Sequence, residues 1–340
     1  MHGRSNLDEP AIDRVSDDRV SDDRALGLVI SIADVREAAD RIRDHVHRTP
    51  ILSSSWLDQD LAASIVFKCE NFQKVGAFKA RGACNAVFSL SDDAAARGVI
   101  THSSGNHAAA LAWAAAARGI PSYVVMPRTA PKVKIEAVRS YGAEIRFCEQ
   151  HERELTCSAW QSETGATLVH PFENPFVIAG QGTAVLELFE ERPDLDVVIV
   201  PVGGGGLCSG SAITTRAMNP DAWILGAEPK AVDDAARSMA TGIRQPRVEN
   251  PETWGDGLLT GLGAPNFELM KTHGVRIVTV DEDAIVDAAR FFLERMKIVV
   301  EPSGATVLAG LIAMRSEIQG KRVGAVISGG NTDFAWLARG

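Results

Sequence analysis

Short apolar runs rich in β-branched residues alternate with helical stretches along most of this chain. Continuous apolar strands separated by helices are typical of parallel sheets that are buried on both faces. The pattern therefore predicts an α/β fold of parallel-rich sheets flanked by helices. The runs that we expect to form strands are 65–69, 98–103, 122–126, 143–148, 197–202, 223–227, 275–280 and 323–328.

The length of the chain and its apolar content predict two lobes. A chain of 340 residues with 45% hydrophobic residues can bury one large core or two smaller ones. Residues 97–172 contain their own strands and helices. We therefore expect them to form a small domain that is inserted into a larger one, made of 29–96 and 173–340.

The N-terminal segment differs from the rest of the chain. Residues 1–28 are polar and contain a tandem repeat of Arg-Val-Ser-Asp-Asp. Because almost no apolar residue precedes Leu26, burial cannot offset the entropy lost on ordering, and we expect a disordered tail. The folded part would then begin with an amphipathic helix from Ile32 to His47, before Thr49 and Pro50.

Charge and cysteine content indicate which kind of ligand the protein binds and in which cellular compartment it works. A net charge of −9 argues against a nucleic-acid groove, which needs clustered Lys and Arg, and favours a small-molecule ligand. The five cysteines are odd in number and contain no Cys-x-x-Cys pair, which is typical of reduced thiols in the cytoplasm. No apolar run reaches the roughly 18 residues that a membrane span needs, and the N-terminus lacks a signal-peptide pattern. We expect a soluble cytoplasmic protein.

Lys79 is the first candidate for chemistry. It follows Phe78 just past a Gly-Ala turn, and a helical pattern begins immediately after it. An apolar ring and a helix N-terminus disfavour the charged form of a lysine, which leaves more of the free amine that forms a Schiff base. A solvated surface lysine is the alternative, and the rest of the chain decides between them.

Two glycine- and hydroxyl-rich loops follow expected strands, where ligands of open parallel sheets bind. Ser103 to His107 would place hydroxyls, an amide and backbone N–H groups at a helix N-terminus, which suits a carboxylate or simply caps the helix. Gly203 to Gly206 would let backbone N–H groups surround a phosphate at the next helix N-terminus, and a flexible turn is the alternative. This loop has neither the Walker nor the dinucleotide-binding spacing.

Two further loops complete the set. Ser328 to Asn331 follows the last strand and would point the hydroxyl of Ser328 at a ligand. Glu228 to Asp234 offers carboxylates and a carbonyl to a hard cation such as magnesium, or is a solvated acidic loop. A reactive lysine, a phosphate loop, a carboxylate loop and a hydroxyl that faces a ring together describe pyridoxal phosphate bound to an amino acid.

These motifs resemble the serine/threonine dehydratase and serine racemase family of pyridoxal-phosphate enzymes, with the fold type II architecture, which is tryptophan synthase β-like. The resemblance runs from about Ala33 to Leu337 and keeps the family's order of motifs. It rests on 68–74 (Lys-Cys-Glu-Asn-Phe-Gln-Lys), 78–82 (Phe-Lys-Ala-Arg-Gly), 103–107 (Ser-Ser-Gly-Asn-His), 179–183 (Ala-Gly-Gln-Gly-Thr), 203–206 (Gly-Gly-Gly-Gly) and 328–331 (Ser-Gly-Gly-Asn).

The resemblance implies a role for each matched residue. Lys79 would bond covalently to the cofactor and act in catalysis, and Ser104 would be the base on the opposite face. The implied cofactor contacts are Phe78, Asn106, Gly203, Gly204, Gly205, Gly206, Leu207 and Ser328. The implied substrate contacts are Ser103, Ser104, Gly105, Asn106, His107, Arg153 and Thr260. Glu228, the carbonyl of Val232 and Asp234 would hold Mg²⁺ or another divalent cation, and a homodimer is implied as well.

The expected reaction is the β-elimination of water from a β-hydroxy amino acid, first of all L-threonine or L-serine, followed by hydrolysis to a 2-oxo acid and ammonia. Ala77 and Phe172 depart from the pattern of many threonine dehydratases and serine racemases, and the segment 295–302 is more similar to hydroxyaspartate dehydratases. Serine racemase and threo-3-hydroxyaspartate dehydratase therefore remain alternatives. A non-catalytic module that binds a phosphorylated ligand is the alternative from another class.

Overall fold

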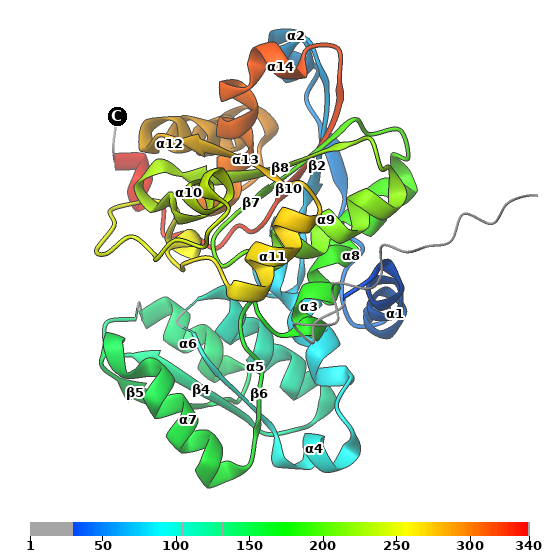
Figure 1. The fold of residues 1–340 in the computed structure, drawn as a ribbon. Coiled ribbons are helices and arrows are strands. Elements are labelled where there is room, and N and C mark those ends of the chain that lie inside the picture. The colour runs from blue at the N-terminus through cyan, green and yellow to red at the C-terminus, as the bar shows by residue number, and fades with distance from the viewer. Residues whose placement is uncertain (1–29, 104, 131, 339–340) are drawn as a thin grey trace, which may run out of the picture.

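The computed structural model describes residues 30–103, 105–130 and 132–338. Two sheets, each flanked by helices, form two lobes (Figure 1). The α/β fold that the apolar runs predict is confirmed. The expected disordered tail, residues 1–28, and Ser104 lie outside the described residues.

The larger lobe is built on a six-stranded sheet that is parallel except for its first strand. β1 pairs antiparallel with β2, and all other neighbours pair parallel. In spatial order the strands are β1 (Ile51–Ser53), β2 (Ser64–Cys69), β10 (Arg322–Ile327), β7 (Val197–Pro201), β8 (Trp223–Pro229) and β9 (Arg276–Val280). Five of the six were expected, and β1 is too short to carry a pattern.

Apolar side chains on both faces of this sheet explain why its strands read as continuous apolar runs. Val197 and Ile199 belong to one buried cluster, whereas Val198 and Val200 belong to another. The first face is covered by α2 (Ser55–Leu61), α12 (Glu282–Phe291) and α13 (Pro302–Ala313). The second is covered by α8 (Pro175–Glu191), α9 (Gly206–Met218) and α11 (Ala264–Thr272).

The smaller lobe is built on a four-stranded parallel sheet. Its spatial order is β5 (Glu144–Cys148), β4 (Ser122–Pro127), β3 (Val99–His102) and β6 (Thr167–Leu168). One face packs against α5 (Asn106–Arg118) and α6 (Lys132–Ser140), and the other against α7 (Arg153–Thr164). All four strands fall within the stretch 97–172, and the domain boundaries themselves stay a prediction.

Helix α3 (Lys79–Phe88) contacts both lobes, because it packs against α5 of the smaller lobe and α8 of the larger one. The first helix, α1 (Ile32–Ile42), begins where the sequence predicts and ends five residues earlier than His47. The remaining α-helices are α4 (Asp92–Arg97), α10 (Asp234–Thr241) and α14 (Arg315–Ile318). Within the described part of the chain, no helix combines the length and apolarity of a membrane span.

Candidate active site

A cleft of about 1010 Å³ lies where residues of both lobes meet, at the carboxyl ends of β3, β7 and β10. Most of the site residues expected from the sequence line it, namely Phe78, Lys79, Ser103, Gly105, Asn106, His107, Arg153, Gly203, Gly204, Gly205, Gly206, Leu207, Thr260 and Ser328. The three expected metal ligands do not line it. The sequence motifs, far apart along the chain, thus converge on one cavity.

Lys79 is the first residue of α3, as its sequence context predicts. Its Nζ donates a hydrogen bond of 2.8 Å to the carbonyl of Pro171 and lies 5.0 Å from the centre of the Phe78 ring. Burial lowers the pKa of the Lys79 amine to about 8. A much larger fraction of this amine is therefore free at neutral pH than of a surface lysine.

The backbone before Lys79 is fixed by the segment that follows β10. The N–H of Phe78 donates to the carbonyl of Ser328 at 2.9 Å, and the N–H of Gly330 donates to the carbonyl of Gly76 at 2.9 Å. These bonds join the lysine segment to the Ser-Gly-Gly-Asn loop. Lys79 and Ser328 consequently have a fixed spacing across the cleft.

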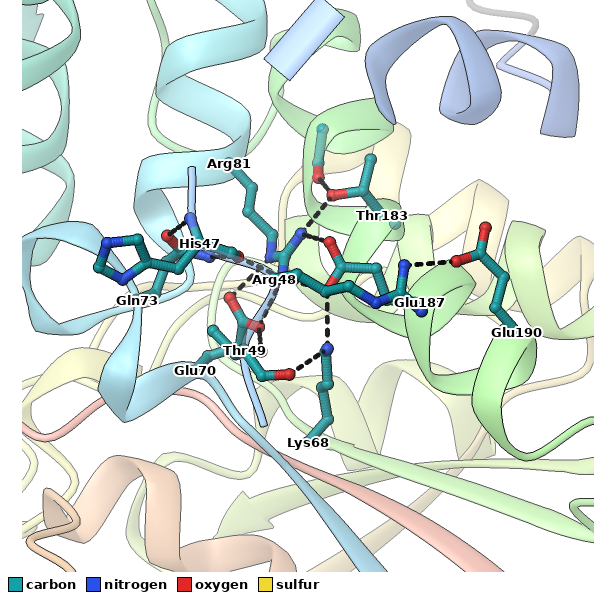
Figure 2. A network of polar contacts seen from close by, with 12 residues as sticks. His47, Arg48, Thr49, Lys68, Glu70, Gln73, Arg81, Thr183, Glu187 and Glu190 are labelled. Atoms are coloured by element: carbon teal, nitrogen blue, oxygen red, sulfur yellow. Dashed lines mark hydrogen bonds and ion pairs between the residues drawn. The ribbon is translucent and has the colours of Figure 1, made fainter. Parts of the chain in front are cut away.

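A cluster of buried charged side chains links α3 to the end of β2 and to α8 (Figure 2). Arg81 is fully buried and forms ion pairs with Glu70, just after β2, and with Glu187, in α8. Lys68 is also fully buried, and its Nζ lies 2.6 Å from Glu187 and donates to the carbonyl of Thr49 at 2.7 Å. The charges in this cluster balance, which is what allows them to be buried.

The glycine loop at the start of α9 can approach a ligand closely. Gly205 has a φ of +88°, a conformation that favours glycine. A Cβ on Gly204 would lie 2.4 Å from the ring of Phe172, so the loop and Phe172 pack without room for a side chain. The first N–H groups of α9 have no partner within the helix and could hold an anion at its N-terminus.

Asn106 is held by two neighbours. Its Nδ2 lies 3.1 Å and 3.2 Å from the carboxylate oxygens of Glu301, and its Oδ1 accepts a bond of 2.9 Å from the amide of Asn331. Glu301 lines the cleft and is only 4% exposed. Burial, with the charge of Asp256, raises the pKa of Glu301 to about 7.

The donors in the cleft fit pyridoxal phosphate. The amine of Lys79 is available for a covalent bond, and the N–H groups at the start of α9 suit a phosphate. Ser328 is largely buried and lines the cleft, and its hydroxyl has no hydrogen-bond partner among the residues that the structure describes. It is therefore free to accept or donate a bond to a ring nitrogen.

In the acidic loop after β8, the carboxylates that were expected to bind a metal already accept hydrogen bonds from backbone N–H groups. The carboxylate of Glu228 accepts bonds from the N–H groups of Ala235 and Ala236, and that of Asp234 accepts one from Leu262. Burial raises the pKa of both carboxyls, that of Glu228 to about 8. Across 30–103, 105–130 and 132–338, no group of three or more His, Cys, Asp or Glu side chains could hold a metal ion. The predicted metal site stays a prediction.

Some cleft residues were not predicted as site residues from the sequence. The ring centroids of His102 and His170 lie 5.5 Å apart in an edge-to-face arrangement. Burial lowers the pKa of His170 to about 4, so the ring of His170 is neutral at pH 7. Lys134, Arg244 and Arg247 also line the cleft. They lie on a helix and a loop without a recognisable motif, and only the spatial arrangement brings them to the site.

Comparisons with known proteins agree with this geometry. Residues 42–329 match the family model described as pyridoxal-phosphate dependent enzyme. A serine racemase of Oryza sativa is 46% identical over 92% of this chain and 94% of its own. A beta-hydroxyaspartate dehydratase of Paracoccus denitrificans is 47% identical over 88% of this chain and 96% of its own. The crystal structure of serine racemase from Dictyostelium discoideum has a TM-score of 0.86 and 44% identity, and covers 89% of this chain and 99% of that one.

Two of these relatives bear the names of the two alternative activities, serine racemase and hydroxyaspartate dehydratase. The cofactor expectation is confirmed at the level of the family. With a match that spans most of its length and a cleft built for the same cofactor, the chain belongs to the family of pyridoxal-phosphate dependent enzymes.

Proposed function

We propose that this enzyme dehydrates a 3-hydroxyaspartate and that hydrolysis of the product then gives oxaloacetate and ammonia. The observation that carries the proposal is Arg153, which lines the cleft and has no ion-pair partner among the described residues; its Nε donates only to the carbonyl of Gln150, at 3.2 Å. A guanidinium without a counter-ion suits a substrate with a second carboxylate. L-Threonine and L-serine have no group that would use it.

Different residues of the cleft bind the substrate carboxylate, the cofactor phosphate and the cofactor ring. The N–H groups at the start of α5, with the Ser103 hydroxyl and the Asn106 amide, bind the α-carboxylate. Gly203 to Gly206 hold the cofactor phosphate, and Ser328 orients the ring through its nitrogen. When bound, the cofactor supplies an electron sink for the negative charge that develops at Cα.

Lys79 supplies the base. Its free amine takes the proton from Cα, and the electron pair left behind expels the β-hydroxyl. The hydroxyl takes a proton from the Lys79 ammonium and leaves as water. The resulting enamine rearranges to an imine, and water hydrolyses the imine to oxaloacetate and ammonia. Racemisation of serine is the second candidate, because relatives of similar identity are named serine racemases. It would require a base on the opposite face, the role implied for Ser104.

The test is the release of 2-oxo acid and ammonia from purified enzyme with L-threonine, L-serine, D-serine and both threo-3-hydroxyaspartates. We expect the highest kcat/KM with a 3-hydroxyaspartate, with oxaloacetate and ammonia in equal amounts. Faster 2-oxobutanoate from L-threonine would contradict the proposal. Interconversion of serine enantiomers that exceeds all elimination would favour the racemase.

Three expectations from the sequence remain proposals. They are a homodimer, which the resemblance implies, a cytoplasmic location, which the cysteine pattern indicates, and a divalent cation bound by the acidic loop after β8. Sedimentation of the purified enzyme tests the homodimer, and imaging of a tagged copy tests the location. Thermal unfolding with magnesium and with a chelator tests the cation. None of the residue roles above depends on the three.

A further inference from the structure

Two arginines from different lobes line the same cleft. Arg153 is the first residue of α7 in the smaller lobe. Arg247 belongs to the loop between α10 and α11 in the larger lobe, at the exposed rim of the cleft. Each lobe therefore contributes one guanidinium to the lining of the cleft.

Neither arginine has an ion pair within the described residues, although other charges in the cleft do. Lys134, for example, pairs with Asp256. The charge of Arg247 acts on Arg153, because after burial it is the largest cause that lowers the pKa of the Arg153 guanidinium. Two like charges in one cleft without a counter-ion repel each other, and a bound anion that contacts both would offset that repulsion.

Two hydrogen bonds anchor the loop that carries Arg247 just before this residue. The N–H of Gln245 donates to the hydroxyl of Ser238 at 2.8 Å, and Arg244 Nη1 donates to the carbonyl of Leu262 at 3.1 Å. A Cβ on Gly261 would lie 2.8 Å from the Cβ of Arg247, so these two stretches of loop touch. This packing fixes the backbone from which Arg247 reaches the cleft.

We infer that Arg247, together with Arg153, forms the subsite for the side-chain carboxylate of the substrate, and that Arg247 is a residue that determines specificity for dicarboxylic amino acids. This inference rests on the proposed function. The α-carboxylate is assigned to the N-terminus of α5, so the second carboxylate needs a separate cation. Guanidinium groups bind carboxylates with two parallel hydrogen bonds, and a pair of them selects a dicarboxylate over a neutral side chain.

The first measurement is the steady-state kinetics of Arg247→Gln. Loss of one charge-assisted contact typically weakens binding by about tenfold or more, so we expect KM for threo-3-hydroxyaspartate to rise by about that factor while kcat changes less than about twofold. KM for L-serine should stay constant, because serine has no second carboxylate. Arg36→Gln, on the exposed face of α1, is the control and should change neither.

The second measurement is independent of turnover. Succinate, which has two carboxylates, and butyrate, which has one, are titrated into the holoenzyme and followed by calorimetry. Wild-type enzyme should bind succinate more tightly than butyrate, and Arg247→Gln should remove most of that difference. Equal losses for both ligands, or an unchanged preference for succinate, would overturn the role of Arg247.

The two measurements separate failure of the inference from failure of the proposed function. Wild-type enzyme that uses L-serine but not 3-hydroxyaspartate overturns the proposed function and, with it, the specificity role. Wild-type enzyme that uses 3-hydroxyaspartate, with an Arg247→Gln variant of unchanged KM, overturns only the role of Arg247.

Discussion

Arg81 and Glu70 share two hydrogen bonds in a fully buried pair, from Nε to Oε2 at 2.7 Å and from Nη2 to Oε1 at 2.9 Å. Arg81 lies two residues after Lys79 on α3, and Glu70 directly follows β2. The pair ties the helix that carries the reactive amine to the central sheet. Loss of the ion pair between Arg81 and Glu70 would therefore shift the position of Lys79.

Arg81→Met should destabilise the protein strongly. Removing one partner of a buried ion pair leaves the other charge without compensation, which typically costs about 3–5 kcal/mol. Urea unfolding should show that loss. Arg315→Met is the matched control, because Arg315 pairs with Asp60 at the surface, where such pairs contribute about 0–1 kcal/mol. Equal effects of the two substitutions would contradict a structural role for the buried cluster.

The low pKa of Lys79 should govern how quickly the protein binds its cofactor. Only the neutral amine attacks an aldehyde, and its fraction falls tenfold for each pH unit below the pKa. Because burial lowers the pKa of Lys79 to about 8 from an ordinary 10.5, the rate of reconstitution of apoprotein with pyridoxal phosphate should rise from pH 6 and level off above about 8. Absorbance of the protein-bound cofactor reports that rate. A rise that continues unchanged to pH 10 would contradict the lowered pKa.

Much of the fold could be predicted because its strands are apolar on both faces. Val197 to Val200 read as one continuous run since alternate side chains enter two different cores, and such runs are recognised without knowledge of their neighbours. β1 and β6 were missed for the opposite reason. With three and two residues they are too short to show a period, and tertiary pairing alone makes them strands.

Site residues could be predicted from the sequence only where the local backbone conformation restricts which amino acid can occupy the position. Gly205 is required by its positive φ, and Lys79 is marked by the turn and helix around it. Arg247 and Glu301 carry no such local signal for a site. Arg247 reaches the cleft because its loop packs on Gly261, and Glu301 because it packs against Gly329. Long-range contacts of this kind are not encoded in any short motif.

Lys79→Ala should abolish both elimination and any racemisation, because the same amine binds the cofactor and takes the Cα proton. Borohydride reduction of the wild-type holoenzyme should attach the cofactor to the peptide that contains Lys79, as mass spectrometry would detect. Lys271→Ala, on the surface of α11, should retain both the adduct and full turnover. Turnover in Lys79→Ala within about tenfold of wild type would contradict the assignment, since loss of a covalent catalyst costs far more.

Magnesium offers a test of the acidic loop after β8. If Glu228 and Asp234 bind a divalent cation, magnesium should raise the melting temperature, and a chelator should reverse the rise. The effect should be larger above pH 8, because burial raises the pKa of Glu228 to about 8 and only the ionised carboxylate binds the cation. Asp234→Asn should remove most of the magnesium response. An identical melting temperature with magnesium and with chelator would exclude stabilisation at this loop.

Glu301 should make the stability of the protein depend on pH. Burial raises the pKa of its carboxyl from an ordinary 4.5 to about 7, so the folded state binds the proton more tightly than the unfolded state does. The stabilising effect of that proton is complete below pH 4.5 and is lost as the pH rises through 7.

In Glu301→Gln this titration is absent, while the amide oxygen of the glutamine still accepts from Asn106. Between pH 5 and pH 8 the free energy of unfolding of the wild-type protein should therefore fall by about 2–3 kcal/mol more than that of the variant, as each unit of pKa shift corresponds to about 1.4 kcal/mol. Urea unfolding of both proteins at several pH values measures the difference. Glu249→Gln, in an exposed loop, is the control, and parallel pH profiles for wild type and Glu301→Gln would show that Glu301 ionises at its ordinary pH in the folded protein.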